Sequence, residues 1–495
     1  MSSLRPLLGQ TAIYGVSSIV GRVVNFFVLT PFYTRIFDPQ QYGLFTELYA
    51  FVAFLLVFLT YGMETAFFRF ASRESDTENR KRVFSTAFIS LLVTSSLFVL
   101  AVNLFEGSIT RFAGYADRPE LILLFAWIVG IDALVTLPLA RLRLQNKPVY
   151  FATVNLLSIG VNIGFNLFFY LYCPEAYAEG DSFVTSWYNP DFGIGYVLVA
   201  NLIGSGVKLL LLLPALKGLQ KGFDFGLYRR LIPYALPLLL LGLAGIVNET
   251  FDRALFTKIS GLSEAEAEIQ LGIYGACYKV AMLLSIGIQA YRFAAEPFIF
   301  SLAKGEKSDK VQADVMKYYF IVALFIFLSI VCFNDVALLL IGSEYREGAD
   351  VIPILLGAYV LFGAVFNLSF WYKLNDKTLY GALVAISGAV VTIVLNLILV
   401  PKISYYGAAW ATFAAYLTMA ILSFILMRKY HPVPYDLKEI GQYIGLALIL
   451  FTIYFFLHPE GLVEYLVGAG VVGIFVLVVF FKERKLFSLN SHDKN

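Results

Sequence analysis

Long apolar segments separated by short polar stretches run along the whole chain. Each is about 20 residues long or longer, which is the length that an α-helix needs to cross a hydrocarbon core of ~30 Å. We delimit fourteen of them: 7–33, 42–63, 83–104, 121–139, 149–172, 192–216, 231–256, 270–297, 318–341, 350–372, 379–400, 405–427, 440–457 and 462–481. The pattern predicts an all-α polytopic membrane protein. The connections are short, and we expect the longest of them, such as 173–191, to be ordinary solvated loops.

The composition agrees with this prediction. Of the 495 residues, 59% are hydrophobic and 15% are charged, whereas soluble domains carry about 25% charged residues. Too little sequence remains between the spans to build a soluble enzyme on a membrane anchor. The pattern also argues against an outer-membrane barrel, because its strands would be short segments of alternating hydrophobicity.

Residues suited to metal or redox chemistry are few. The three cysteines, Cys173, Cys277 and Cys332, lie far apart and form no CxxC or zinc-type spacing, and the three histidines fall in loops or the tail. No P-loop is present, so we expect the chain not to hydrolyse nucleotides itself. We therefore expect no metal site, no bound cofactor and no nucleic-acid partner.

Lysine and arginine are distributed unequally between alternate loops, which predicts the orientation of the chain. The set of loops that includes both termini contains 26 of these residues. The opposite set contains six: Arg35, Arg111, Arg118, Lys258, Arg346 and Lys402. Because basic loops stay in the cytoplasm, we expect both termini to be cytoplasmic.

A faint internal repeat relates the two halves of the chain. Thr34-Arg35-Ile36 at the end of the first span is matched by Thr257-Lys258-Ile259 at the end of the seventh. The next span begins in both cases with an N-cap residue followed three positions later by Gln or Glu. Any helix start can look like this, which is the alternative explanation. The repeat predicts a six-helix bundle at 1–216, a second at 217–427, and two further helices with a tail at 428–495.

Charged residues inside the spans are the main functional candidates, since a charge at the bilayer centre costs roughly 2.5–3.5 kcal/mol on insertion scales. Most lie in the first spans of each predicted half, whereas spans 11 to 13 contain none. The clearest are Arg22, Asp132, Lys208, Glu249, Asp252, Arg253, Lys279 and Arg292. Lys208 lies near the cytoplasmic end of its span, where its side chain can snorkel to the interface.

Several of these residues share a helical face with other polar side chains. Arg22 and Asn25 lie on one stripe of the first span, Asn248 and Asp252 on one face of the seventh, and Gln289 and Arg292 on one face of the eighth. We interpret them as the lining of a water-filled cavity between the halves, with a cationic surface formed by Arg22, Arg253, Lys279 and Arg292. The alternative is local neutralisation, of Arg253 by Glu249 and of Arg292 by Glu296.

Three stretches resemble a known family. They are Gly21-Arg22, Asn25-Phe26 and Pro31-Phe32-Tyr33 followed by Tyr42-Gly43; Asp252-Arg253 followed by Gly272-Ile273-Tyr274-Gly275; and Gly342-Ser343-Glu344-Tyr345 with Ala349. Together they resemble the O-antigen and capsule polysaccharide flippases of the multidrug/oligosaccharidyl-lipid/polysaccharide superfamily. The resemblance covers essentially the whole chain in span number and topology, while each motif alone is weakly specific.

The resemblance implies a MATE-like fold, with two six-helix bundles facing each other in a V and two extra C-terminal helices. It implies a monomeric flippase of the bacterial inner membrane that moves undecaprenyl-diphosphate-linked oligosaccharide to the periplasmic leaflet, beside a polysaccharide polymerase machinery. By this resemblance the cavity cations hold the diphosphate. An H⁺ or Na⁺ gradient is often coupled in such proteins, and the polar residues that could support coupling are Asn25, Asp132, Asn248, Glu249, Asp252 and Gln289.

Three other functions compete with this one. The two extra C-terminal spans also resemble the lipid II flippases, so the peptidoglycan precursor is a rival substrate. A MATE-like drug antiporter would use a dominant acidic site, for which Asp132, Glu249 and Asp252 are the candidates, but the neighbouring basic residues disfavour it. A membrane glycosyltransferase or polymerase would offer catalytic residues on sizeable outer loops, and the outer loops here are short. We therefore expect the chain not to be an enzyme.

Overall fold

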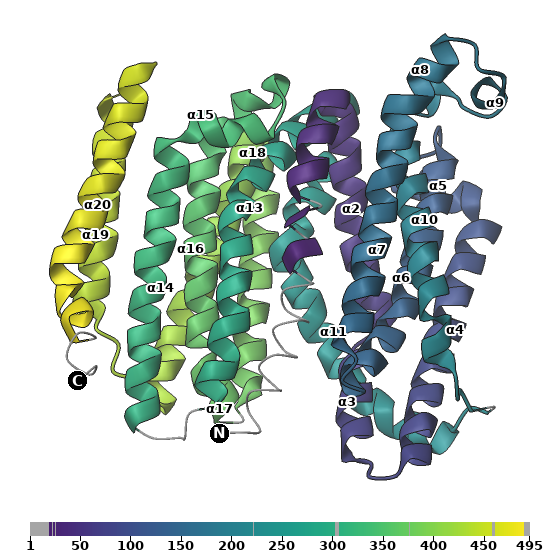
Figure 1. Ribbon diagram of the computed structural model, residues 1–495, viewed down its shortest axis with the longest axis horizontal. Coiled ribbons are helices and arrows are strands. Elements are labelled where there is room, and N and C mark those ends of the chain that lie inside the picture. The colour runs from purple at the N-terminus through teal and green to yellow at the C-terminus, as the bar shows by residue number, and fades with distance from the viewer. Residues whose placement is uncertain are drawn as a thin grey trace. The chain divides into compact units, whose positions relative to one another are not determined.

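The computed structural model describes residues 19–21, 23–24, 26–220, 222–301, 306–375, 377–457 and 461–489, and all regular structure within them is helical. The predicted all-α fold is thus confirmed for these residues. The chain divides into two compact units, Met1–Phe256 (unit 1) and Thr257–Asn495 (unit 2). In Figure 1 unit 1 runs from purple to teal and unit 2 from teal to yellow.

Unit 1 begins with a helix at 26–36. The next helices are α2 (Pro39–Thr60), α3 (Met63–Arg73), α4 (Thr77–Leu104), α5 (Glu106–Ala113) and α6 (Pro119–Leu144). They are followed by α7 (Pro148–Leu167), the π-helical turn η1 (Phe168–Tyr172), α8 (Cys173–Ala178) and α9 (Ser182–Thr185). The unit ends with the 3₁₀ turn η2 (Pro190–Phe192), α10 (Gly195–Leu212), the 3₁₀ turn η3 (Leu213–Leu216) and α11 (Phe225–Ala254).

The short helix α12 (Phe256–Ile259) lies at the boundary between the units. Unit 2 then contains α13 (Glu264–Ser301), α14 (Glu306–Cys332), α15 (Asn334–Ala337), the 3₁₀ segments η4 (Leu338–Leu340) and η5 (Ser343–Val351), α16 (Ile352–Leu368), α17 (Phe370–Leu374), α18 (Thr378–Tyr430), α19 (Leu437–Leu457) and α20 (Leu462–Leu489).

Twelve helical segments of the described residues are long and apolar enough to cross a membrane, counting α18 once. α18 is interrupted at Ile403 and Ser404, where the backbone is not helical and Ser404 has a φ of 52°. The chain folds back there, since a Cβ on Gly407 would lie 2.5 Å from the carbonyl carbon of Leu399. α18 therefore comprises two spans, as the sequence predicts, and the total agrees with the expected number of about fourteen.

The stretch after the second predicted span is helical rather than a loop. Tyr61 and Gly62 adopt left-handed φ angles of 31° and 72°, which end α2 and redirect the chain into α3. A Cβ on Gly62 would lie 2.6 Å from the carbonyl oxygen of Ala235 on α11. Only glycine allows both this conformation and this close approach. α3 thereby carries Arg69 and Arg73 on a folded element.

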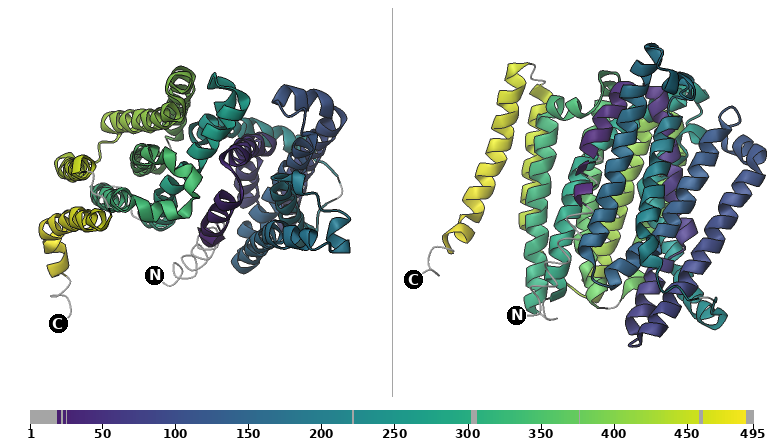
Figure 2. Two further views of the ribbon diagram at one scale, coloured as in Figure 1. Left: turned by 90° about the horizontal axis from the view of Figure 1, so that it is seen from above. Right: turned by 45° about the vertical axis from the view of Figure 1, so that its right-hand side comes forward.

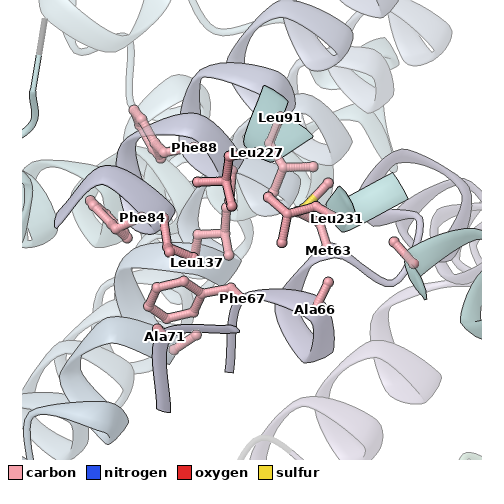
Figure 3. Close-up of a cluster of buried hydrophobic side chains, with 14 of the residues drawn as sticks. Met63, Ala66, Phe67, Ala71, Phe84, Phe88, Leu91, Leu137, Leu227 and Leu231 are labelled. Atoms are coloured by element: carbon pink, nitrogen blue, oxygen red, sulfur yellow. The ribbon is translucent and has the colours of Figure 1, made fainter. Parts of the chain in front are cut away.

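The best-packed part of unit 1 joins α3, α4, α6 and α11. Figure 3 shows this cluster, in which the labelled side chains are Met63, Ala66, Phe67, Ala71, Phe84, Phe88, Leu91, Leu137, Leu227 and Leu231. Because lipid tails are as apolar as these side chains, their close van der Waals packing stabilises the unit more than removal from water does. α11 therefore packs within unit 1 in this structure. The division into bundles after residues 216 and 427 stays a prediction.

Unit 2 is built around α13, which packs against α14, α16 and η5. The last two helices, α19 and α20, lie side by side along α14 (Figures 1 and 2). Glu483 of α20 is only 8% exposed and stabilises the contact of α19 and α20 with α14. Its carboxylate accepts hydrogen bonds from Lys317 Nζ at 3.1 Å and Tyr443 OH at 2.7 Å. The two extra helices are thus bound to the rest of unit 2 through a buried charge.

Candidate functional site

The predicted site residues fall into three groups in the structure. Arg22 and Asn25 lie outside the described residues. In unit 1 the candidates are Asp132 on α6 and Asn248, Glu249, Asp252 and Arg253 on α11. In unit 2 they are Lys279, Gln289 and Arg292, all on α13. The single cavity between the halves stays a prediction.

At the end of α11, Arg253 forms an ion pair with the adjacent Asp252. Arg253 Nε lies 3.5 Å from Asp252 Oδ1, and the side chains are 12% and 2% exposed. Asp252 Oδ1 also accepts a hydrogen bond of 2.9 Å from the backbone N–H of Arg253. Arg253 Nη2 in turn donates to the backbone carbonyl of Glu249.

This geometry differs from the alternative in which Glu249 neutralises Arg253. The Glu249 side chain is exposed, and the acid paired with Arg253 is Asp252. The reason is burial: a guanidinium in a low-dielectric environment is stabilised most by a carboxylate that is itself shielded from water. Asn248, one turn before Asp252, is also buried at 6% exposure. α11 therefore presents a charge-compensated cation beside a buried amide.

Asp132 lies midway along α6 and accepts a hydrogen bond of 2.8 Å from Ser205 Oγ on α10. One turn earlier on α10, Asn201 Nδ2 donates to the hydroxyl of Tyr49 on α2. Because Asn201 lies one helical turn before Ser205, this bond lies next to the contact between Ser205 and Asp132. Three transmembrane helices thus place polar side chains around one carboxylate.

A second buried contact continues this arrangement. Tyr33 OH donates to Asn166 Oδ1 on α7 at 2.8 Å, and Asn166 Nδ2 donates to the carbonyl oxygen of Asn162 at 2.8 Å. The ring of Phe45 joins the two parts, with ring centroids 5.2 Å from Tyr33 and 4.4 Å from Tyr49. We call the set the unit 1 polar cluster: Tyr33, Tyr49, Asp132, Asn166, Asn201 and Ser205.

The unit 1 polar cluster can exchange a proton or hold a small cation. An ionised carboxylate in a membrane span is costly unless protons, cations or donors compensate it. Asp132 has a hydroxyl donor on one oxygen, and neutral oxygens and amides surround it. A charge inside an apolar span identifies Asp132 from the sequence, but this criterion does not detect the uncharged polar residues around it. The amides Asn162, Asn166 and Asn201 inside apolar spans were the available signal.

Lys279 and Arg292 do not form one site on α13. They are thirteen residues apart, which corresponds to about 20 Å along a helix. The side chain of Lys279 is partly buried, and its neighbours in the chain, Tyr278 and Val280, are fully buried. Gln289, which lies one turn before Arg292, is also partly buried. The two cations therefore act at different depths of unit 2.

Arg292 belongs to a cluster at the junction of α13, α16 and α17. Its Cζ lies 4.6 Å from the centre of the Phe366 ring, and Lys373 Nζ lies 5.2 Å from the same ring. Lys373 Nζ forms an ion pair of 3.0 Å with Glu296 Oε1. We call this set the Phe366 cluster: Arg292, Glu296, Phe366 and Lys373. Two cations and one carboxylate leave it with a net positive charge.

Buried hydrogen bonds hold the Phe366 cluster in place. Tyr291 OH, next to Arg292, donates to Asn367 Oδ1, next to Phe366. Asn367 is 2% exposed, and its Nδ2 donates to the carbonyl oxygen of Gly363 at 2.9 Å. These bonds fix α13 against α16 and so fix the direction of the guanidinium.

The partner of Glu296 differs from the predicted alternative. The acid that was expected to neutralise Arg292 pairs with Lys373 instead. The sequence places Lys373 in the connection after the predicted span 350–372, and its approach to Glu296, 77 positions earlier in the chain, depends on the packing of α17. Arg292 is thus left against an aromatic ring, an arrangement in which a guanidinium keeps its hydrogen-bond donors available.

Among the described residues, no group of three or more His, Cys, Asp and Glu side chains could hold a metal ion. The three cysteines are buried and unpaired. The charged and polar side chains of the two clusters are suited to the binding of ions and charged groups.

The sequence matches the family described as polysaccharide biosynthesis protein over residues 7–303. It is also 24% identical to the uncharacterized membrane protein MJ1068 of Methanocaldococcus jannaschii, over 85% of this chain and 84% of that protein.

Solved structures share the fold. The lipid II flippase MurJ, in an inward closed conformation, has a TM-score of 0.72 at 14% identity and covers 96% of this chain and 99% of its own. A multidrug resistance MATE family transporter of the MOP superfamily, in an inward-facing conformation, has a TM-score of 0.63 at 15% identity, with 82% and 94% covered. The chain thus shares its fold with these solved structures.

Proposed function

Because this chain belongs to the polysaccharide biosynthesis protein family, we propose that it is a flippase for lipid-linked oligosaccharides. Its substrate is an undecaprenyl-diphosphate-linked glycan repeat unit of the O-antigen, lipopolysaccharide or capsule type. The protein moves this unit from the cytoplasmic to the periplasmic leaflet of a bacterial inner membrane by alternating access. Both termini lie in the cytoplasm, and the protein acts as a monomer beside the polymerase machinery.

The Phe366 cluster is the observation that carries this proposal. Its Lys373 belongs to the connection after the predicted span 350–372, at the end of unit 2 that the basic loops assign to the cytoplasm. A diphosphate headgroup enters from that side. Arg292 offers a planar set of donors that can bind phosphate oxygens bidentately, and Lys373 adds a point charge.

Arg253 and Arg22 are the further cations that we assign to the transport path. The Arg253–Asp252 pair gives a reversible site, because a phosphate can replace the carboxylate as the partner of the guanidinium. Binding then costs the ion pair between Asp252 and Arg253, and the contact of the guanidinium with the phosphate offsets this cost. Lys279 provides a second position at another depth of unit 2.

We assign ion coupling to the unit 1 polar cluster. Asp132 takes up and releases H⁺ or binds Na⁺, with Ser205, Asn201 and Tyr49 as neutral neighbours that support either form. Asn25, Asn248, Glu249 and Gln289 are the other polar residues that we place along the path.

A lipid II flippase is the second candidate function. It is favoured by the structural match to MurJ, which extends over 96% of this chain and so includes the two C-terminal helices. Both candidates share a polyprenyl diphosphate and differ in the attached glycan.

The test is substrate translocation in proteoliposomes, with a fluorescent lipid-linked oligosaccharide and lipid II compared side by side. Arg292→Ala and Lys373→Ala should each lower the translocation rate about tenfold or more, because a hydrogen bond to a charged group contributes about 1.5–3 kcal/mol. Lys377→Ala is the matched control: it removes a lysine from the same connection, where the side chain is exposed.

Wild-type rates in both variants of the Phe366 cluster would contradict its role in headgroup binding. Faster movement of lipid II than of the oligosaccharide would favour the second candidate. Absence of translocation of both lipids by the wild-type protein would contradict the flippase function itself.

A further inference from the structure

Beyond the transport path, unit 1 carries a folded element at the end opposite to α3 (Figure 1). It begins where α7 continues through η1 into α8, a continuous helical stretch of 31 residues, Pro148–Ala178. Such a helix is about 46 Å long, whereas the hydrocarbon core is only ~30 Å thick. Since the helix starts at the basic, cytoplasmic end, its last turns project beyond the opposite membrane surface. We call residues 168–192 the aromatic cap.

The aromatic cap is a folded structure and not the solvated loop that the sequence suggests. Tyr188 stacks on Tyr196 of α10 with ring centroids 5.0 Å apart, around the buried residues Phe169, Cys173 and Val184. The backbone N–H of Asn189 donates to Tyr196 OH at 2.8 Å. Burial raises the pKa of Tyr188 to about 12, so this ring stays neutral at physiological pH. The core therefore holds the outer face of the cap in one conformation.

Three exposed aromatic rings on the aromatic cap are joined through the half-buried ring of Phe168. Phe168 stacks between Tyr172 and Trp187, with ring centroids 5.4 and 6.2 Å away and interplanar angles of 17° for both pairs. Phe183 meets Trp187 edge-on at 6.0 Å. Phe183 is 68% exposed, Tyr172 51% and Trp187 40%. Folding thus orders a large aromatic area without covering it.

The charge of this surface has one sign. The aromatic cap contains Glu175, Glu179, Asp181 and Asp191, and no lysine or arginine occurs anywhere from residue 148 to residue 207. Asp181 is engaged as the N-cap of α9, and the side chains of Glu175 and Glu179 are exposed. A ligand of this surface therefore has apolar faces and hydroxyl or ammonium donors, and it is not an acid.

We propose that the aromatic cap is a glycan-binding platform on the extracytoplasmic side, selective for neutral or amino-sugar oligosaccharides. The C–H faces of sugar rings lie on the exposed aromatic rings, and carboxylates accept hydrogen bonds from sugar hydroxyl or ammonium groups. The inference rests on the proposed function, because a flippase releases a glycan on this side. It narrows the substrate to repeat units without net negative charge at the sugars that meet the cap.

A lipid surface is the competing occupant, and the composition of the aromatic cap disfavours it. Interfacial elements usually combine aromatic residues with lysine or arginine, which attract lipid headgroups. Here the rings are accompanied by carboxylates and by the exposed polar side chains Ser182, Thr185, Ser186 and Asn189. Acids of this kind repel anionic headgroups, so the rings are better matched to sugars.

The test uses single-tryptophan variants of the full chain in nanodiscs. Trp187 is kept while the other three tryptophans are changed to Phe, and the reference variant keeps Trp127, which is 48% exposed on the membrane span α6. Tetrasaccharides of N-acetylglucosamine, glucosamine and galacturonic acid are added in turn. We expect the first two to shift Trp187 emission saturably, the acidic one to have at least tenfold weaker affinity, and Trp127 to respond to none. Bromolipids should quench Trp127 but not Trp187.

Phe183→Ser tests the platform without disturbing its core, because Phe183 contacts the rings from outside. It should weaken oligosaccharide binding about tenfold, whereas Phe112→Ser, which removes a 93% exposed ring from α5, should not. Quenching of Trp187 by bromolipid as strong as that of Trp127 would overturn the proposal in favour of a lipid contact. Lack of saturable binding, or equal binding of the acidic sugar, would also overturn it. Translocation measured with the same protein separates either failure from failure of the flippase function.

Discussion

At the scale of single residues, the cations of this membrane protein are held by specific partners. Arg253 is paired with Asp252, Lys373 with Glu296, and Arg292 lies on the Phe366 ring. The common cause is the high cost of an unpaired charge at low dielectric. If these cations bind the transported substrate, as we propose, the substrate exchanges with these partners, and its binding is reversible and sensitive to single substitutions.

Asp132→Asn tests the coupling role of the unit 1 polar cluster. The amide can still accept the Ser205 hydrogen bond, but it can no longer release a proton or balance a cation. We expect stimulation of translocation by an imposed H⁺ or Na⁺ gradient to fall about tenfold or more, while exchange without a gradient persists. Rates in proteoliposomes with and without each gradient measure this.

Asp117→Asn is the control for this substitution, since Asp117 is exposed in the connection before the same helix. A gradient response of Asp132→Asn equal to that of Asp117→Asn would exclude Asp132 as the coupling residue.

At the scale of elements, buried polar contacts decide how the helices are joined. The contact of α19 and α20 with α14 depends on Glu483, which accepts bonds from Lys317, Tyr443 and, at 3.3 Å, Tyr318. α19 and α20 together form the C-terminal hairpin. At its other end, Tyr454 OH on α19 donates to the carbonyl oxygen of Cys332 on α14 at 3.0 Å. Apolar helix surfaces alone give no strong preference between lipid and protein, so these polar contacts specify the position of the hairpin.

Glu483→Ala should loosen the C-terminal hairpin. The substitution removes the acceptor of the buried Tyr443 hydroxyl and leaves Lys317 with Glu439, at 3.3 Å, as its remaining carboxylate partner. Loss of the acceptor of a buried donor costs about 1–3 kcal/mol. We expect a thermal unfolding midpoint lower by several degrees and faster proteolysis between α18 and α19. Arg484→Ala, at the exposed neighbouring position, should change neither. Unaltered thermal stability of Glu483→Ala would show that apolar packing alone holds the hairpin.

At the scale of the whole molecule, each of the two units is a compact group of long apolar helices with polar contacts between them. Unit 1 holds the coupling candidate and the Arg253–Asp252 pair, while unit 2 holds the Phe366 cluster. The distribution of basic residues predicts which ends of these helices face the cytoplasm.

Cysteine labelling tests this orientation. The three native cysteines are buried, so the wild-type chain should react little with a membrane-impermeant maleimide. In intact cells or spheroplasts, Ser182→Cys in the aromatic cap should be labelled from outside, and Ser75→Cys between α3 and α4 only after permeabilisation. The reverse pattern would invert the topology and place the aromatic cap in the cytoplasm.

Several features of the candidate site were accessible from the sequence. Charged residues in apolar spans selected Asp132, Asp252, Arg253 and Arg292, because the cost of a buried charge makes such residues rare. Their partners were only partly accessible. The alternative to a cationic cavity named acids one helical turn away as the partners. The structure instead pairs Arg253 with the adjacent Asp252 and joins Glu296 to Lys373 on another helix.

Hydrophobicity over about 20 residues is a local property, so the pattern along the chain was enough to place the protein in a membrane, to delimit most spans and to reveal the asymmetry of the basic loops. The family resemblance also came from local motifs. Three features required the three-dimensional structure: the packing of α11 within unit 1, the folding of residues 168–192 into an aromatic cap, and the hydrogen bond between Asp132 and Ser205. These features depend on contacts between residues far apart in the chain, which single-helix periodicity does not encode.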